Sequence, residues 1–342
     1  MTGFQNDILK ASSLPLPWGK LEGCNILILG ATGLIGSCLV KVLLARNEAD
    51  YHIYAGGRDR SRAKILFKSF ETDERFHFLP IDVTSPINCD IDFHFMIDAA
   101  SNASPNFFAS NPVEIMKSNI YGVANLLDYG KEHNLKRFLF VSSGEIYGQG
   151  DGRPFTEDYS GFVDYSSPRS CYPSSKRAAE VLCQAYAQEY GLDVTIARPC
   201  HVYGPYFSNH DNRVYAQFFR NLLNNEDIIL RSDGSQYRSW CYVIDCVSAL
   251  FYILLKGDSK GTYNVADPFS VVSIRELADK IASLKQKAVI VQIPDISEQK
   301  GYNPVTRSVF DTTKIESLGW SPQDSMDNNL RKTYSELLNT RF

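Results

Sequence analysis

A tyrosine and a lysine four residues apart stand in the stretch CYPSSK, at Tyr172 and Lys176. Residues four apart share one face of a helix, so the lysine charge would lower the pKa of the phenol from its usual value of about 10. A phenolate held in this way could remove a proton from a hydroxyl group while the same carbon loses hydride. The spacing alone does not decide, because Tyr252 and Lys256 repeat it in YILLK, within what looks like an apolar core helix.

The residues around the first pair favour a catalytic interpretation. The run RFLFVSS (137–143) has the composition of a buried strand, and Ser143 and Glu145 stand at its carboxyl end. The stretch PSSKRAAEVLCQAYAQEYG is typical of a helix, with Pro173 in its first turn and Gly191 after its last. The predicted catalytic residues are Tyr172, Lys176, Ser143 and Glu145.

A glycine-rich turn near the start of the chain predicts a dinucleotide site. The run CNILILG (24–30) indicates a strand, SCLVKVLLAR (37–46) indicates a helix, and GATGLIG lies between them. A tight turn needs a residue without Cβ, a pyrophosphate needs close approach to the backbone, and the helix start supplies free N–H groups. The predicted cofactor contacts in this turn are Gly30, Thr32, Gly33, Leu34, Ile35 and Gly36.

Further strands repeat this alternation with helices. They are expected at 51–57, 76–83, 93–100, 137–143 and 193–199, with helices such as 113–133 between several of them. The alternation predicts an α/β fold with a doubly wound parallel sheet, whose ligands bind beyond the carboxyl ends of the strands. The residues expected to line that crevice, besides Ser143, are Asp82, Val83, Ala99, Ala100, Ser101 and Pro199. For Asp82, a role as a turn former at the strand end is the alternative.

The end of the second strand lacks the carboxylate that usually binds the adenosine ribose. The chain has GGRD there, so Arg58 could accommodate a 2′-phosphate or stack on adenine. Alternatively Arg58 is a solvated surface residue beside Arg60 and Arg62. The sequence therefore leaves the preference between NAD and NADP open.

Composition excludes several classes of protein. The 342 residues are 44% apolar and 22% charged, which suits one large or two unequal globular domains. A net charge of −4 without a Lys/Arg-rich block argues against a nucleic-acid surface, and no apolar run reaches the ~18 residues of a membrane helix. The eight cysteines form no CxxC pair, so we expect free thiols in the cytoplasm and no metal site. Residues 1–22 are expected to form an N-terminal arm.

The motifs together resemble the extended short-chain dehydrogenase/reductase family, specifically its nucleotide-sugar epimerases, dehydratases and decarboxylases. GATGLIG, SSGEIYG and YPSSK carry this resemblance, which covers nearly the whole chain after about residue 22. Within the family, NASPNF, PRSCYPSSKRAAEVLCQAY, HDNRVYAQFFRNLL and GSQYRSWCYV are most similar to UDP-glucuronate decarboxylases.

The resemblance implies an architecture and a set of partners. It implies a Rossmann-type dinucleotide-binding domain over residues 23–200, to which some later segments return, and a smaller α/β substrate-binding lobe that contains most of residues 201–342. It also implies NAD as cofactor, with NADP as the option raised by Arg58, and a nucleotide-diphosphate sugar as substrate. A homodimer would form through helices at 113–133 and 173–190.

The resemblance also assigns roles to single residues. Tyr172 would be the base, Lys176 its partner and a ribose contact, Ser143 a hydroxyl holding the sugar oxygen, and Glu145 an auxiliary acid, base or positioning group. The residues implied in substrate binding are Asn106, His201, Arg213, Arg238 and Arg307. Arginines suit the diphosphate because a guanidinium pairs with phosphate oxygens through two hydrogen bonds.

Three departures from the family pattern bear on the reaction. The 4,6-dehydratases have an aspartate acid before the glutamate, where this chain has Gly144. His201 replaces a usual asparagine, and is either a substrate contact or a buried structural histidine. Where the family has HLA the chain has IDA, and Asp98 would need a partner if buried.

The sequence supports oxidation at the sugar C4 more firmly than any later step. A transient 4-keto sugar can lose carbon dioxide, return as the 4-epimer or undergo 4,6-dehydration, and decarboxylation is the favoured outcome by resemblance. A protein that binds NAD(P) without catalysis, in a regulatory role, is the alternative from another class.

Overall fold

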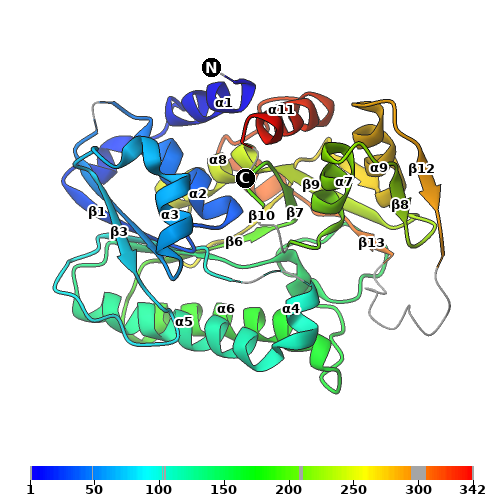
Figure 1. The fold of residues 1–342 in the computed structure, drawn as a ribbon. Helices are drawn as coiled ribbons and strands as arrows, with labels where there is room; N and C mark the ends of the chain where they lie inside the picture. The colour runs from blue at the N-terminus through cyan, green and yellow to red at the C-terminus, as the bar shows by residue number, and fades with distance from the viewer. Residues whose placement is uncertain are drawn as a thin grey trace.

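The fold is built on one central parallel sheet. A computed structural model describes residues 2–47, 49–101, 103, 105–207, 211–293 and 306–340, apart from the side chains at 105 and 106. The seven strands lie in the order β10-β6-β5-β4-β1-β2-β3, all parallel (Figure 1). Their bounds are β1 Cys24–Leu29, β2 Tyr51–Gly57, β3 Phe76–Pro80, β4 Phe95–Asp98, β5 Arg137–Val141, β6 Val194–Pro199 and β10 Thr262–Val265. The strand order reverses between β1 and β4, which opens a crevice at their carboxyl ends.

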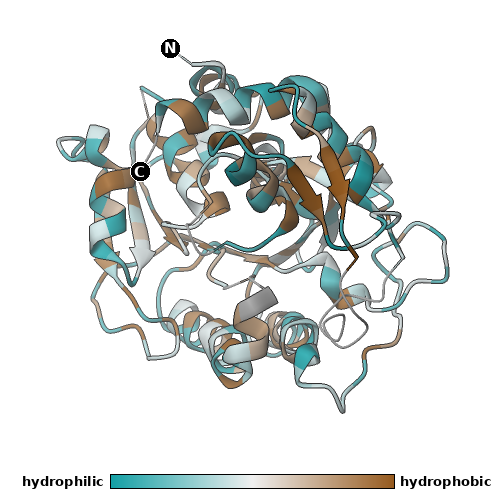
Figure 2. Ribbon diagram, turned by 45° about the vertical axis from the view of Figure 1, so that its right-hand side comes forward, coloured by the Kyte–Doolittle hydropathy of each residue, from teal (hydrophilic) through white to brown (hydrophobic). Residues whose placement is uncertain are grey.

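Helices cover both faces of this sheet. On one face lie α4 Pro105–Ser110, α5 Pro112–Glu132 and α6 Cys171–Glu189, and on the other lie α2 Leu34–Leu44, α3 Arg60–Leu66 and α8 Val243–Lys256 (Figure 1). Figure 2 shows apolar residues along the sheet between these two layers, as burial on both faces requires. The predicted α/β, doubly wound parallel fold is confirmed.

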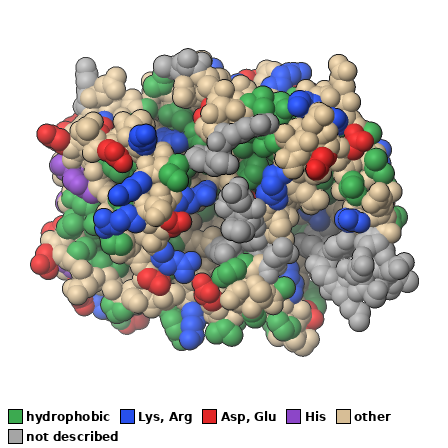
Figure 3. Space-filling view, viewed as in Figure 1, with side chains coloured by type: hydrophobic (Ala, Val, Ile, Leu, Met, Phe, Trp, Pro, Cys, Tyr) green, Lys and Arg blue, Asp and Glu red, His purple; other side chains and the backbone are tan. Residues whose placement is uncertain are grey.

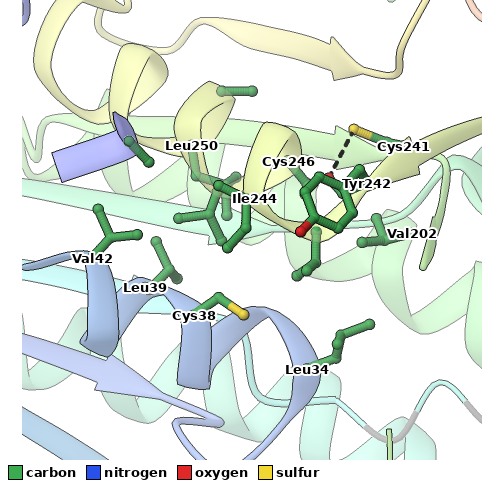
Figure 4. Packing of buried hydrophobic residues seen from close by; sticks show 14 of the residues in the cluster. Leu34, Cys38, Leu39, Val42, Val202, Cys241, Tyr242, Ile244, Cys246 and Leu250 are labelled. Carbon is green, nitrogen blue, oxygen red and sulfur yellow. Dashed lines mark hydrogen bonds between the residues drawn. The ribbon is translucent and has the colours of Figure 1, made fainter. Parts of the chain in front are cut away.

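The two faces have separate cores. On one, Cys38 and Leu39 of α2 lie opposite Ile244 and Leu250 of α8 (Figure 4). The other core lies between the sheet and α5 and α6, and contains Leu127 from α5. Close packing on both sides fixes the positions of the strand ends, and these carry the site.

A smaller region follows β6. The strands β7 His201–Tyr203, β9 Tyr237–Tyr242, β11 Val271–Ser273 and β13 Arg307–Ser308 form a second sheet, and β8 Ile228–Leu230 pairs with β12 Val289–Val291. The remaining helices of this part are α7 Val214–Leu223, α9 Ile274–Ser283, α10 Thr313–Ser317 and α11 Met326–Asn339. Because α8 and β10 belong to the central layers, the chain leaves the main sheet after β6 and returns to it.

The first residues pack on the main body. The helix α1 Gly3–Ser12 is capped by Thr2 and contacts α2, α8 and α11. The Phe4 ring meets the Tyr206 ring edge-on at 5.2 Å, and Lys332 of α11 binds the Asp7 carboxylate at 2.9 Å. The short helices η1 Trp18–Leu21 and η2 Lys68–Phe70 complete this half of the chain. Among the helices of the described ranges, none is long and apolar enough to cross a membrane.

Several strands end earlier than the sequence suggested. The predicted strand 137–143 stops at Val141, because Ser143 caps the short helix η3 Gly144–Tyr147. The predicted strand 76–83 stops at Pro80, and Asp82 begins a turn instead. In both places a small polar side chain bonds the backbone two residues on and ends the extended conformation.

Candidate active site

The glycine turn has no room for side chains. Gly30 has φ +70°, and a Cβ there would lie 2.5 Å from the carbonyl oxygen of Ala99. A Cβ on Gly36 would lie 2.2 Å from the carbonyl oxygen of Gly30. Gly33 is the N-cap of α2 and has no side chain to cap the helix. The first N–H groups of the helix can therefore donate hydrogen bonds to a ligand. This cradle fits a dinucleotide pyrophosphate, and it brings the predicted Ala99 and Ala100 against the turn.

The end of β2 faces the same turn at one position. A Cβ on Gly56 would lie 2.8 Å from Leu29, in the sheet layer, whereas a Cβ on Gly57 would be nearest to Thr32, at 3.7 Å. Arg58 is exposed and pairs with Glu114 at 3.3 Å. Arg62, which the sequence suggested only as a surface neighbour, donates from Nε to the Thr32 carbonyl at 2.9 Å. Figure 3 shows the face of the molecule that is also seen in Figure 1, and several Lys and Arg side chains lie close together on it.

Asp82 and Val83 follow β3 and act first on the fold. The Asp82 carboxylate accepts hydrogen bonds from the backbone N–H and the hydroxyl of Thr84, which lower its pKa, and the charge of Arg58 lowers it further. Val83 packs against Gly122 of α5, where an added Cβ would lie 3.1 Å away. The turn role offered as the alternative for Asp82 is therefore present.

Tyr172 is buried on the crevice side of α6. Burial raises its pKa to about 12, while hydrogen bonds with Ser143 and Ser101 and the charge of Arg213 oppose that rise. This differs from the sequence prediction of a pKa lowered by Lys176. A phenol in a dry site stays protonated until nearby positive charge compensates for its burial.

Lys176 is almost fully enclosed, with 1% of its surface exposed. Its Nζ donates to the Val141 carbonyl at 2.8 Å and lies 4.5 Å from the centre of the Phe140 ring. Burial lowers its pKa to about 8, and the charge of Asp98 opposes that decrease. Lys176 therefore sits at the carboxyl end of β5 with a buried carboxylate nearby.

That carboxylate accounts for the departure noted at IDA. Asp98 is the register partner of Phe140 across β4 and β5, so their side chains share the sheet face where Lys176 lies. Its Oδ1 accepts the N–H of Ala100 at 3.0 Å. Burial raises the pKa of Asp98, and Lys176 with the Ala100 N–H opposes this. The sequence left Asp98 without a partner, because the pairing needs the register of two strands and a helix.

A buried polar chain supports the crevice behind Tyr172. Ser101 donates to Asn119 of α5 at 2.9 Å, and Asn119 donates to Ser175 of α6 at 2.9 Å. Ser175 in turn donates to the carbonyl of Cys171 at 2.6 Å. Asn119 stands within the helix predicted at 113–133, and the sequence analysis assigned this residue no role.

Glu145 is held by a residue that the sequence analysis missed. Both terminal nitrogens of Arg169 lie 3.1 Å from Glu145 Oε2, and Nη2 lies 3.2 Å from Oε1. The Arg169 guanidinium also lies 4.8 Å from the centre of the Phe108 ring, and that ring stacks on Tyr172 at 4.6 Å and 18°. Arg169 stands in PRSCY, three residues before the predicted base Tyr172. This closeness in the sequence could have indicated that Arg169 belongs to the site.

The position before Glu145 is sterically closed. A Cβ on Gly144 would lie 1.9 Å from Cζ of Phe310, which is itself buried against Tyr147 and Phe155. Phe310 thus fills the space that a side chain at 144 would need. The space of the acid that the dehydratases have at this position is therefore taken by an aromatic ring from near the C-terminal end of the chain.

Three of the predicted substrate residues act on one another electrostatically. Burial and the charges of Arg238 and Arg213 lower the pKa of His201 to about 3, so its imidazole is neutral. Its Nδ1 is buried and meets no hydrogen-bond partner in the part of the chain that the structure describes. Burial lowers the pKa of Arg238 to about 10, with Glu145 opposing, and Arg213 donates from Nε to Asp211 at 3.0 Å. Two guanidinium groups and a neutral histidine suit an anionic ligand that carries hydroxyl donors.

The other two predicted substrate residues are not brought into this group. Arg307 is exposed and is the register partner of Tyr237, whereas Ser308 pairs with Arg238. Successive side chains of a strand point to opposite faces, so Arg307 and Arg238 project to opposite sides of the small sheet. The side chain of Asn106 lies outside the described residues. The last of the predicted cofactor contacts, Pro199, is buried at the end of β6.

The comparisons with known proteins agree with this geometry. Residues 26–266 match the model of the NAD dependent epimerase/dehydratase family. The chain is 33% identical to UDP-glucuronic acid decarboxylase 6 of Arabidopsis thaliana over 299 residues, 87% of this chain and 84% of that protein. It is 31% identical to UDP-glucuronic acid decarboxylase 1 of Danio rerio over 312 residues, 90% of this chain and 71% of that protein.

Solved structures share the fold at lower identity. UDP-glucuronic acid 4-epimerase from Bacillus cereus, in complex with UDP-glucuronic acid and NAD, has a TM-score of 0.79 and 22% identity, covering 93% of this chain and all of its own. The dTDP-glucose 4,6-dehydratase from Streptomyces venezuelae, with NAD bound, has a TM-score of 0.79 and 24% identity, covering 93% and 98%. The glycine cradle, the strand-end residues and the matched residues 26–266 lead to one conclusion: this chain belongs to the NAD-dependent epimerase/dehydratase family.

Proposed function

We propose that this protein is an NAD-dependent nucleotide-sugar enzyme that forms a transient 4-keto sugar, and that it decarboxylates UDP-glucuronate. The observation that carries the proposal is that Tyr172 bonds with Ser143 and lies in the field of Arg213, which together with Arg238 acts on His201. Lys176 follows Tyr172 one turn later on α6. The relatives of 31–33% identity named as UDP-glucuronic acid decarboxylases support the choice of reaction.

The side chains divide the first step among them. Tyr172 removes the proton of the sugar 4-hydroxyl, and the Ser143 hydroxyl orients that oxygen by hydrogen bonding. The glycine cradle would hold NAD, which would supply the reversible hydride acceptor that oxidation at C4 requires. Lys176 supplies positive charge near the base and the cofactor ribose. This charge is needed because burial alone raises the pKa of Tyr172 to about 12.

The second step follows from the 4-ketone. The bond between C5 and the C6 carboxylate breaks, its electron pair passes to the enolate of C5 and C4, and carbon dioxide leaves. C5 then takes a proton from solvent water. Tyr172 returns its proton to the C4 oxygen as the ketone is reduced, and the product is a pentose. Elimination of water would need an acid close to the leaving hydroxyl, and Phe310 closes position 144 against such a side chain. This closure supports decarboxylation over 4,6-dehydration.

A second candidate is 4-epimerisation. It needs only the first oxidation, rotation of the ketosugar and hydride return to the other face, so the closed position at 144 does not hinder it. A regulatory protein that binds NAD(P) without catalysis is a third candidate. The burial of both Tyr172 and Lys176 speaks against it, since burying a phenol and a lysine has a cost that a passive binder need not bear.

Mass spectrometry of the reaction products tests the proposal. Purified protein with NAD or NADP is incubated separately with UDP-glucuronate, UDP-glucose, UDP-N-acetylglucosamine and dTDP-glucose. We expect a mass loss corresponding to carbon dioxide from UDP-glucuronate alone. Loss of water would contradict the argument from Gly144, an unchanged mass with a new isomer would establish an epimerase, and no product from any sugar would favour the non-catalytic candidate.

We also propose a homodimer and a cytoplasmic location. Exposed apolar side chains on α5 and α6, among them Val113, Tyr121 and Val181, support pairing of these helices with a second copy. Light scattering after size exclusion should give twice the chain mass, and Val181→Asp should give one chain mass. Ile65→Asp on α3, similarly exposed on the other layer, is the control that should stay dimeric. The eight free cysteines support the reducing compartment.

A further inference from the structure

Arg169 closes a ring of contacts around Tyr172 and Glu145. On one side, Ser143 bonds with Tyr172 and accepts the backbone N–H of Glu145 at 3.2 Å. On the other, Arg169 holds the Glu145 carboxylate and lies on Phe108, which stacks on Tyr172. Four segments of the chain meet in this ring, at η3, α4, α6 and η4 Pro168–Ser170.

Glu145 also lies close to the strand that carries Arg238. The Phe310 ring fills the space beside Gly144, and the Phe310 N–H donates to Ser239 Oγ at 3.1 Å, next to Arg238. Arg238 is 5% exposed, and Glu145 is the charged group whose field opposes the effect of burial on it. A carboxylate released at this point would pair with the buried guanidinium of Arg238. Such a pair is favourable in a site shielded from water when the two groups can form close hydrogen bonds. In the structure Arg169 occupies both Glu145 oxygens instead.

We propose that Arg169 is a positioning residue, which binds both oxygens of Glu145 through three hydrogen bonds and so keeps that carboxylate from competing with the anionic part of the substrate for Arg238. The inference rests on the proposed function, since it takes a nucleotide diphosphate as the ligand of Arg238. Arg169 also fixes Glu145 at a set distance from the base, through the same ring of contacts. A lysine at 169 would keep the charge and lose the two-pronged geometry.

Calorimetric titration of UDP into the protein with NAD tests this without relying on turnover. Arg169→Gln should weaken UDP binding about tenfold, the effect expected when a competing carboxylate replaces one charge-assisted hydrogen bond to the ligand. The double variant Arg169→Gln/Glu145→Gln should restore the affinity, because the competing carboxylate is gone. Arg169→Lys should fall between the wild type and Arg169→Gln. A merely structural role for Arg169 would not be repaired by removing Glu145.

The matched control is Arg153→Gln. Arg153 makes the same kind of pair with Asp151 on an exposed loop, with Nε to Oδ2 at 2.9 Å, and its removal should leave UDP affinity unchanged. Equal affinity of Arg169→Gln and the wild type would overturn the inference alone, as would a double variant that binds no better than the single one. Absence of UDP binding by the wild type would overturn the proposed function and this inference together.

Discussion

The proposed cofactor half and the proposed substrate half of the site are built in different ways. The cofactor half consists of backbone and missing side chains, since Gly30 and Gly36 contact carbonyl groups where a Cβ would collide. The substrate half consists of charged side chains that neutralise one another, as Glu145 does with Arg169 and Arg213 with Asp211. The first half tolerates almost no added atom, whereas the second can exchange partners.

This difference predicts how each half responds to change. Steric collision with backbone has no easy relief, so substitutions on the cofactor side should act all or none. Charge pairs relax by finding other partners or by titrating, so substitutions on the substrate side should act in steps and depend on pH. Tyr172 lies where the halves meet, and its loss should be the most severe.

Tyr172→Phe removes the proton acceptor and leaves the stacked ring in place. We expect the turnover rate to fall about 10²- to 10⁴-fold, the usual contribution of a positioned base, while NAD binding is kept. Steady-state product formation and NAD titration measure the two effects. The control is Tyr252→Phe, in the second tyrosine–lysine pair, where Lys256 bonds the Leu318 carbonyl and lies 5.1 Å from the Tyr252 ring on α8. Equal decreases in both variants would remove the distinction between the pairs.

Gly36→Ala should remove NAD binding, because its Cβ would lie 2.2 Å from the Gly30 carbonyl oxygen and displace the turn. Overpacking of this kind costs about 1–3 kcal/mol in the free energy of unfolding. Gly57→Ala is the matched control at the rim of the same cradle, where the nearest atom would be 3.7 Å away. Fluorescence titration with NAD and thermal unfolding check both variants. If Gly36→Ala bound NAD as well as Gly57→Ala does, the backbone of the glycine turn could shift to accommodate an added Cβ, which would contradict this prediction.

The sequence predicted the local geometry of the glycine turn better than the contacts around Glu145 and Asp98, for a physical reason. The cradle is encoded within GATGLIG, where strand, turn and helix are adjacent, so spacing alone predicts its geometry. The pairs of the substrate half join residues far apart in the chain, such as Gly144 with Phe310 and Glu145 with Arg169. Asp98 shows the same limit, since its partner becomes visible only through the register of β4 and β5. The phenol pKa was predicted in the wrong direction because spacing gives charge but not burial.

Asp98→Asn should have the smallest effect, and a pH-dependent one. The pKa of Lys176 is already lowered to about 8 by burial, and removing the Asp98 charge that opposes this would lower it further. Lys176 would then lose its proton at a lower pH, so the alkaline limb of the rate profile should move toward neutral pH. A decrease of about one unit would cut the charged fraction about fivefold at pH 8 and change it little at pH 6. The rate measured across this range checks the shift.

Asp98→Asn should affect the free energy of unfolding most at low pH, whereas it should affect the reaction rate most at high pH. The folded state lowers the pKa of Lys176, so charged Lys176 decreases the free energy of unfolding. This decrease is fully present below the folded-state pKa. It disappears as the pH rises toward the pKa that Lys176 has in the unfolded chain. Without Asp98 this decrease grows, so denaturant unfolding should reveal a greater decrease in stability at pH 6 than at pH 9. Lysine NMR, assigned with Lys176→Arg, follows the titration without any substrate. An unmoved lysine pKa would mean that Asp98 acts through the Ala100 N–H alone, and this part of the site would then resemble the backbone-built half.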